Sequence, residues 1–253
     1  MSKTTIIAHR GANKYAPQNT IPAFKRAIEL GAEGFETDVH ITKDGEIVLC
    51  HNYTIDETST GKGEISSMTL SELKSYDYGS YFSKKFEGTE IPTLDEFLSF
   101  VETTDIKVLN IEIKSPKENE TDIVAKTISA VKEHDLFDKL LISSFDPKLL
   151  VEAKKIDKKC KTGFLYAPNR LITLTMAWRP VEFAKSLGCD ALHPQYVFLL
   201  KKGYIKRAHD AGLMVNPWTV NDPAIIAKLL EAGSDGIISD LPDVICKMKE
   251  RYE

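Results

Sequence analysis

The chain has 253 residues, of which 42% are hydrophobic and 28% are charged, and its formal net charge is −4. This composition excludes a disordered or fibrous protein, and the acidic balance offers no complementary surface to nucleic acid or an anionic membrane. No apolar run approaches the roughly 20 residues of a bilayer span, so we expect no membrane anchor.

The amino-terminal residues, MSKTTIIAHRG, enter a predicted strand without the apolar stretch or cleavage site of a signal peptide. We therefore expect a cytoplasmic protein. The cysteines lack the close spacing of zinc ligands or of a disulfide framework, so we expect reduced packing residues. They are Cys50, Cys160, Cys189 and Cys246.

Short apolar strands alternate with amphipathic helices along the chain, which is typical of βα units around a parallel sheet. The predicted strands cover 4–10, 33–41, 107–114, 139–145, 161–167, 189–195, 213–220 and 235–240. The predicted helices cover 19–30, 93–102, 121–135, 147–157, 179–188, 201–212, 223–233 and 242–252. Eight strands that are each followed by a helix predict a TIM-type (β/α)8 barrel, whose active site lies at the carboxyl ends of the strands.

Left-handed C-caps are expected where a glycine follows a predicted helix, at Gly31, Gly188, Gly212 and Gly233. We find no linker that would divide the chain, so residues 1–253 are predicted to form a single domain.

Two stretches depart from the βα alternation. The segment TKDG at 42–45 predicts a hairpin turn, so the second strand should have an antiparallel extension that ends at His51. The span from about 53 to 92 is too long for a βα loop and includes a helical signal, MTLSELKSY. Its aromatic residues predict a small inserted subdomain: Tyr76, Tyr78, Tyr81, Phe82 and Phe86.

Acidic side chains stand near the ends of two predicted strands. Glu36 and Asp38 share one face of a strand, and Glu112 near the end of NIEIK shares its face with Lys114. A buried carboxylate requires a hydrogen-bonded partner or a metal. Three carboxylates at one barrel mouth favour a hard divalent cation, Mg2+ or Ca2+ with Mn2+ as a further candidate. The alternative is that these acids pair with arginine or lysine.

Two histidines also end predicted strands. His9 lies in AHRG and is followed by Arg10, whose guanidinium suits a phosphate, and His51 ends the hairpin. Because imidazole exchanges protons near neutral pH, two histidines beside a metal favour acid/base phosphoryl transfer over structural roles.

Other residues near strand ends are weaker candidates. His40 shares the face of the acidic pair but lies further along the hairpin, which favours a structural role, and His193 is a weak candidate. Trp218, near Asn221, could wall a pocket or cover an apolar or cationic part of a substrate. No pattern singles out Ser144, Phe145, Ser239 or Asp240.

Seven segments stand in one order from the first strand to the last: AHRGANKYAPQNT, FETDVHITKDGEIVLCHN, TGKG, YGSYFSKKFEGTEIPTLDEFL, NIEIK, WTVN and ISDLPD. As an ordered set they resemble the glycerophosphodiester phosphodiesterase family. The resemblance implies metal-dependent hydrolysis of glycerophosphodiesters, such as glycerophosphocholine or glycerophosphoethanolamine, to sn-glycerol 3-phosphate and an alcohol.

The resemblance also implies roles for eight residues: catalytic His9 and His51; metal-binding Glu36, Asp38 and Glu112; substrate-binding Arg10, Lys114 and Trp218. In the implied mechanism the glycerol 2-hydroxyl attacks phosphorus, and water then opens the cyclic phosphate. His9 is assigned as the first base and His51 as the first acid, and their roles exchange in the second half-reaction.

Three positions depart from the family pattern. Gln18 replaces a glutamate, Asn52 stands where an aspartate often follows the histidine, and Ser239 stands where threonine is common. A lost carboxylate can change the orientation or pKa of a histidine, but each amide still hydrogen-bonds, so we expect retuned activity rather than its loss.

Two alternatives to a glycerophosphodiesterase remain. One is a phosphate-ester binding protein whose catalysis has lapsed, which the presence of both histidines and all three carboxylates disfavours. The other is a related barrel enzyme that cleaves lysophospholipids, which would require an apolar or basic surface for the bilayer. The sequence leaves open the leaving alcohol, the identity of the metal and the oligomeric state.

Overall fold

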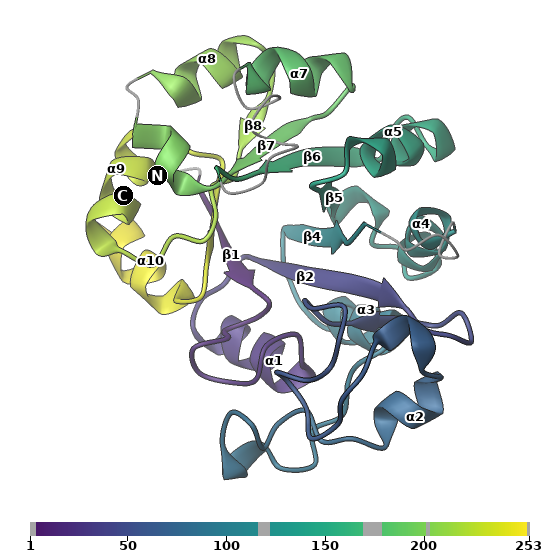
Figure 1. Ribbon diagram of the computed structural model, residues 1–253. Coiled ribbons are helices and arrows are strands. Elements are labelled where there is room, and N and C mark those ends of the chain that lie inside the picture. The colour runs from purple at the N-terminus through teal and green to yellow at the C-terminus, as the bar shows by residue number, and fades with distance from the viewer. Residues whose placement is uncertain (1–3, 116–121, 169–178, 201–202, 252–253) are drawn as a thin grey trace.

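The computed structural model describes residues 4–115, 122–168, 179–200 and 203–251, which form a parallel barrel surrounded by helices (Figure 1). The barrel strands are β1 (Thr5–His9), β2 (Gly34–Ile41), β4 (Val108–Ile113), β5 (Leu140–Ser144), β6 (Lys161–Tyr166), β7 (Ala191–Pro194), β8 (Met214–Val215) and β9 (Gly236–Ser239). They are neighbours in the order β8-β7-β6-β5-β4-β2-β1-β9. Backbone hydrogen bonds from Asp235 to Val215 and from Ile238 to Pro217 join β9 to the β8 segment. The predicted (β/α)8 barrel is confirmed.

The helices lie outside the ring of strands (Figure 1). They are α1 (Ile21–Glu29), α3 (Leu94–Glu102), α4 (Ile123–Glu133), α5 (Pro147–Ile156), α7 (Pro180–Ser186), α8 (Tyr204–Asp210), α9 (Pro223–Glu231) and α10 (Pro242–Lys249). Four of them begin at a proline, whose fixed φ suits the first turn of a helix. Each predicted helix overlaps an observed one, although positions 121, 201, 202 and 252 of the predicted ranges lie outside the described residues. The four predicted C-cap glycines have φ between 72° and 84°, as expected for left-handed caps.

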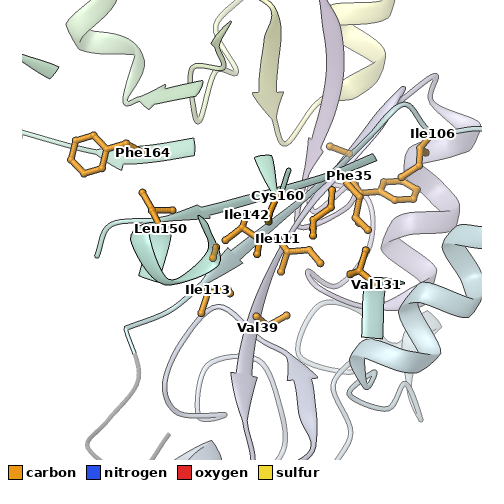
Figure 2. Close-up of a cluster of buried hydrophobic side chains, with 14 of the residues drawn as sticks. Phe35, Val39, Ile106, Ile111, Ile113, Val131, Ile142, Leu150, Cys160 and Phe164 are labelled. Atoms are coloured by element: carbon orange, nitrogen blue, oxygen red, sulfur yellow. The ribbon is translucent and has the colours of Figure 1, made fainter. Parts of the chain in front are cut away.

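The main core lies between the outer face of the strands and the helices. Figure 2 shows Phe35 of β2, Ile111 of β4 and Ile142 of β5 in this cluster, with Val131 of α4 and Leu150 of α5. Because side chains alternate along a strand, burial of these residues against the helices turns the neighbouring residues toward the barrel interior. The alternation therefore directs the acidic residues of β2 and β4 inward.

The predicted hairpin is confirmed, although its returning strand ends at Leu49 and not at His51. Strand β2 extends beyond the barrel and pairs antiparallel with β3 (Ile47–Leu49), so that Val39 lies opposite Leu49. Gly45 takes a φ of 89° in the turn, a conformation that glycine adopts without strain. The returning strand brings His51 back to the barrel mouth.

Residues after the hairpin contain the short helix α2 (Leu70–Lys74), which begins with a capping box between Thr69 and Glu72. A second buried cluster, distinct from the main core, consists of Val48, Cys50, Ile55, Ile65, Leu73, Tyr78 and Ile91. Two of the aromatic residues expected to pack here remain accessible, with Tyr81 40% and Phe82 37% exposed. Within the described ranges, no helix is both long and apolar enough to traverse a bilayer.

Candidate active site

The three predicted carboxylates meet inside the barrel at its carboxyl end. Strands β2 and β4 pair in register, which places Asp38 opposite Glu112 and Glu36 opposite Asn110. Each carboxylate offers an oxygen such that these atoms all lie within 4.8 Å of one another. All three side chains are buried, with residue exposures of 4% for Glu36, 0% for Asp38 and 7% for Glu112. This set of oxygen donors suits a hard divalent cation.

Two cations contact the acidic cluster. Lys114 Nζ lies 2.7 Å from Asp38 Oδ1 and 2.6 Å from Glu112 Oε1, and Arg10 Nε lies 3.4 Å from Asp38 Oδ2. Burial opposes ionisation of Asp38, but Lys114 and then Arg10 hold the pKa of this carboxyl well below its usual range. The alternative of pairing with lysine and arginine is therefore part of the observed arrangement.

The pairing leaves negative charge uncompensated in the cluster. Burial and then the charge of Asp38 raise the pKa of Glu36 well above its ordinary value. Burial likewise raises the pKa of Glu112 despite the neighbouring Lys114. Additional positive charge at these oxygens would therefore favour the ionised carboxylates.

His9 is supported by a carboxylate from the last strand. Its Nδ1 lies 2.6 Å from Asp240 Oδ1, and Asn13 and Asn221 donate to the two Asp240 oxygens at 2.7 and 2.6 Å. Because a carboxylate only accepts, His9 Nδ1 carries the proton and Nε2 lies 3.9 Å from Glu36 Oε2. Burial and the charge of Arg10 lower the pKa of His9, although Asp240 acts in the opposite direction.

The hydrogen-bond partner of His51 Nδ1 is an amide, whereas that of His9 Nδ1 is a carboxylate. His51 Nδ1 lies 2.7 Å from Asn52 Oδ1. Burial lowers the pKa of His51 to about 4, and the charges of Lys114 and Arg10 contribute in the same direction while Asp38 opposes them. His40 lies behind this residue, with Nε2 3.4 Å from the His51 carbonyl and its ring edge-on to Tyr53. This position outside the cavity fits the structural role that the sequence favours for His40.

A cavity of about 270 Å³ opens between two chemically different halves of the barrel mouth. The charged half comprises β9, β1, β2, β4 and the residue that follows the hairpin. It lines the cavity with His9, Arg10, Glu36, His51, Asn110 and Glu112, together with the apolar Ile238 of β9. The neutral half comprises β5 to β8 and the residues that follow them, and lines it with Ser143, Phe145, Leu165, Ala167, Gln195 and Trp218. Trp218 Nε1 donates to the His193 carbonyl at 2.7 Å, and its ring packs edge-on against Phe145.

A second cavity of about 450 Å³ adjoins the first and shares His51, Glu112 and Phe145 with it. Its wall also includes Lys114 and Glu57. Of the eight predicted site residues, seven line one cavity or the other, and Asp38 lies fully buried behind them. His193 lines neither cavity.

The sequence patterns did not single out several supporting residues. Asp240 was one of four strand-end residues without a distinguishing pattern, yet it contacts His9 because barrel closure places β9 beside β1. Asn19 donates to Asp38 Oδ2 at 2.9 Å, which nothing in its local sequence indicated. Gln18 Oε1 accepts from Arg10 at 2.7 Å. This departure from the family pattern therefore changes the hydrogen-bond partner of the arginine and not that of a histidine.

Together the fold and site define a TIM-barrel protein whose mouth combines an acidic cluster, two histidines and two cations suited to a phosphate ester. A model of the glycerophosphoryl diester phosphodiesterase family matches residues 9–244. A glycerophosphodiester phosphodiesterase from Caldanaerobacter subterraneus subsp. tengcongensis is 39% identical over 246 residues, which cover 97% of this chain and 98% of the relative. Another from Bacillus altitudinis is 30% identical and covers 99% of this chain and 100% of its own length.

A solved structure has a similar fold. The phosphodiesterase from Oleispira antarctica, in complex with the product sn-glycerol 3-phosphate, has a TM-score of 0.86 and is 31% identical. The match covers 97% of this chain and 96% of the Oleispira chain. The chain therefore belongs to the glycerophosphoryl diester phosphodiesterase family and is an enzyme with glycerophosphodiester phosphodiesterase activity.

Proposed function

We propose that this enzyme hydrolyses glycerophosphodiesters such as glycerophosphocholine and glycerophosphoethanolamine to sn-glycerol 3-phosphate and an alcohol, using a divalent cation and two histidines. The observation that carries the proposal is the convergence of two histidines and two carboxylates, Glu36 and Glu112, on one cavity, with Asp38 buried behind them. The product bound by the Oleispira relative supports the same reaction.

Glu36, Asp38 and Glu112 would hold the cation, Mg2+ or Ca2+ with Mn2+ as a further candidate, because all three offer carboxylate oxygens. When bound, the cation would lower the pKa of the attacking hydroxyl and neutralise charge on the phosphate. Arg10 and Lys114 would hold the phosphate oxygens, since each presents a cation at a cavity wall.

His9 suits the first base. When it takes the proton of the glycerol 2-hydroxyl at Nε2, the Asp240 carboxylate stabilises the imidazolium that forms. His51 would protonate the departing alcohol, and the two histidines would exchange roles when water opens the cyclic phosphate. We place the alcohol in the larger cavity, because that cavity begins at His51. Trp218 would line the pocket from the neutral half.

Two features away from the chemistry belong to the same proposal. We interpret residues 53–92 as a subdomain inserted after β2, supported by the separate buried cluster that includes Ile55, Leu73 and Ile91. The cytoplasmic location stays a prediction, with which the free state of the four cysteines agrees.

The test uses purified protein stripped with chelator and incubated with glycerophosphocholine, alone and with Mg2+, Ca2+ or Mn2+ restored. Release of sn-glycerol 3-phosphate is followed through a coupled dehydrogenase. We expect release only with metal, and its loss in His9→Ala and His51→Ala. Full activity of the stripped protein would contradict the metal requirement.

The exposed side chains of Tyr81 and Phe82 give a reason to test lysophospholipids as well. Hydrolysis of lysophosphatidylcholine micelles is compared with that of glycerophosphocholine. A strong preference for micelles would replace the proposed substrate class, whereas we expect preference for the small diester.

A further inference from the structure

An unusual hydrogen-bond chain supports His51. Asn52 Oδ1 lies 2.7 Å from His51 Nδ1, and Asn52 Nδ2 donates to Glu57 Oε2 at 2.9 Å. Resting on the function proposed above, we infer that Glu57 is a positioning residue for the reaction, acting on His51 through the Asn52 amide. Glu57 is exposed and lies in the wall of the second cavity.

The direction of this chain follows from the chemistry of its members. An amide can present either its oxygen or its NH2 group to a histidine, whereas an ionised carboxylate can only accept hydrogen bonds. Glu57 therefore requires the NH2 group of Asn52, which turns the amide oxygen toward His51. His51 must then donate from Nδ1, so its Nε2 is the nitrogen that is free to exchange a proton.

The local fold holds Glu57 at this position. Ile55 is buried in the second core cluster, and its amide donates to the Gly63 carbonyl. The Thr58 amide donates to the Ile55 carbonyl, which closes a tight turn around Glu57. Asp56 accepts from the Gly63 amide at 2.8 Å. The turn directs the Glu57 carboxylate back toward Asn52.

The charge of Glu57 also serves the acid role proposed for His51. Burial disfavours a protonated His51, and so do the charges of Lys114 and Arg10, whereas Asp38 favours it. A carboxylate behind Asn52 polarises the amide so that its oxygen is a stronger acceptor for the imidazolium. Removal of Glu57 should free the amide to rotate and weaken the protonated form of His51.

The kinetic test compares Glu57→Ala and Glu57→Gln with the unmodified enzyme on glycerophosphocholine. We expect Glu57→Ala to lower kcat about tenfold, with KM changed by less than about twofold, as for loss of one charge-assisted hydrogen bond. Glu57→Gln should cost less, because a glutamine carbonyl can still accept from Asn52. The basic limb of the kcat–pH profile should move to lower pH in Glu57→Ala. Glu87→Gln, an exposed carboxylate of the same segment, is the matched control.

The decisive comparison uses an Asn52→Asp background. An aspartate accepts from His51 Nδ1 in either orientation and repels the neighbouring Glu57, so Glu57→Ala should no longer lower kcat there. An equal loss of kcat in both backgrounds, or no loss in the unmodified one, would overturn the inference.

A spectroscopic measurement separates this inference from the proposed reaction. The 15N chemical shifts of the His51 ring, assigned by comparison with His51→Ala, should show protonated Nδ1 in the unmodified protein near neutral pH. Glu57→Ala should introduce the Nε2-protonated tautomer. Identical ring shifts with and without Glu57 would overturn the inference whether or not the protein cleaves glycerophosphocholine.

Discussion

The charged and neutral halves of the barrel mouth are built on the same strand–helix framework, but they present different chemistry to the cavity. In the charged half, ionisable side chains support one another, as Lys114 does for Asp38 and Asp240 does for His9. In the neutral half, Phe145 and Trp218 pack against each other, and no ion pair is found among the described residues that line it. Under the proposed function, the charged half would carry out the proton and charge chemistry, while the neutral half would set the shape of the cavity.

The largest loss of activity should follow from a substitution of Glu112 in the charged half. We expect Glu112→Gln to lower kcat/KM at least about 10³-fold, because a bound cation supplies several kcal/mol of transition-state stabilisation. The measurement is glycerophosphocholine hydrolysis at saturating metal, together with the metal content of the dialysed protein.

Glu46→Gln is the control for Glu112→Gln, since Glu46 is exposed at the hairpin turn. It should retain both activity and metal. Undiminished metal binding and activity in Glu112→Gln would show that the acidic cluster is only structural.

A smaller effect, about 100-fold in kcat, is expected for Asp240→Asn. Both Asp240 oxygens accept hydrogen bonds, from His9 and Asn13 on one and from Asn221 on the other. An asparagine has only one oxygen, so its NH2 group would face a donor in either orientation. The measurement is the pH profile of kcat, whose acidic limb should change when the support for protonated His9 is lost.

Asp243→Asn provides the comparison for Asp240→Asn, because Asp243 accepts from Tyr15 and Lys247 near the surface. If both variants had the same kcat and pH profile, Asp240 would have no positioning role.

The sequence predicted the parts of this site that depend on local periodicity. Alternation along a strand placed Glu36 and Asp38 on one face, and the barrel prediction brought Glu112 to the same mouth. It did not predict the partner of His9, since Asp240 lies 231 residues away and the contact depends on closure of the ring. Nor could it predict that Asn52 turns its oxygen to His51, because the orientation of an amide depends on a third residue in three dimensions.

The sequence pattern also could not predict which aromatic residues of the inserted segment are buried and which are exposed. An aromatic residue is equally compatible with a core and with a partly exposed surface, and here Tyr78 is buried whereas Tyr81 is exposed. The alternation of strands and helices fixes the barrel, but the long segment after the hairpin has no such repeat to decide which aromatic faces inward.

The buried His193 of the neutral half should make the stability of the folded protein depend on pH. His193 Nε2 accepts from the Asn216 side-chain NH2 group at 3.2 Å. Gly163 leaves room for the His193 ring, since a Cβ at this position would lie 2.6 Å from Nε2. Burial lowers the pKa of His193 to about 3. The folded protein therefore keeps this ring neutral while the unfolded chain takes up a proton below pH ~6.5, so stability falls as pH decreases from there toward 3.

We expect His193→Gln to weaken this pH dependence. Between pH 7 and pH 5 the unmodified protein should lose about 2 kcal/mol more unfolding free energy than the variant. Urea denaturation at both pH values measures the difference, and the gap between the two proteins should be constant from pH 7 to pH 8. An equal loss in both proteins between pH 7 and pH 5 would show that this histidine does not stay neutral in the folded state.

The smallest effect is expected from a substitution at Trp218 in the neutral half. It should change KM and leave kcat nearly unchanged, in contrast to the substitutions in the charged half. Trp218→Leu removes aromatic surface from the cavity wall, and a loss of about 55 Å² of apolar contact corresponds to ~1.4 kcal/mol, or about tenfold in KM. The kcat should change by less than about twofold, because Trp218 contacts neither histidine ring in the ways that Asp240 and Asn52 do.

Trp218→Phe is the matched variant, since it keeps an aromatic ring against Phe145 while losing the hydrogen bond to the His193 carbonyl. A KM near that of the unmodified enzyme in Trp218→Phe would assign the effect to the ring surface. A fall in kcat as large as that of Asp240→Asn would instead place Trp218 in the chemical step, and the division between a reacting half and a shaping half would no longer hold.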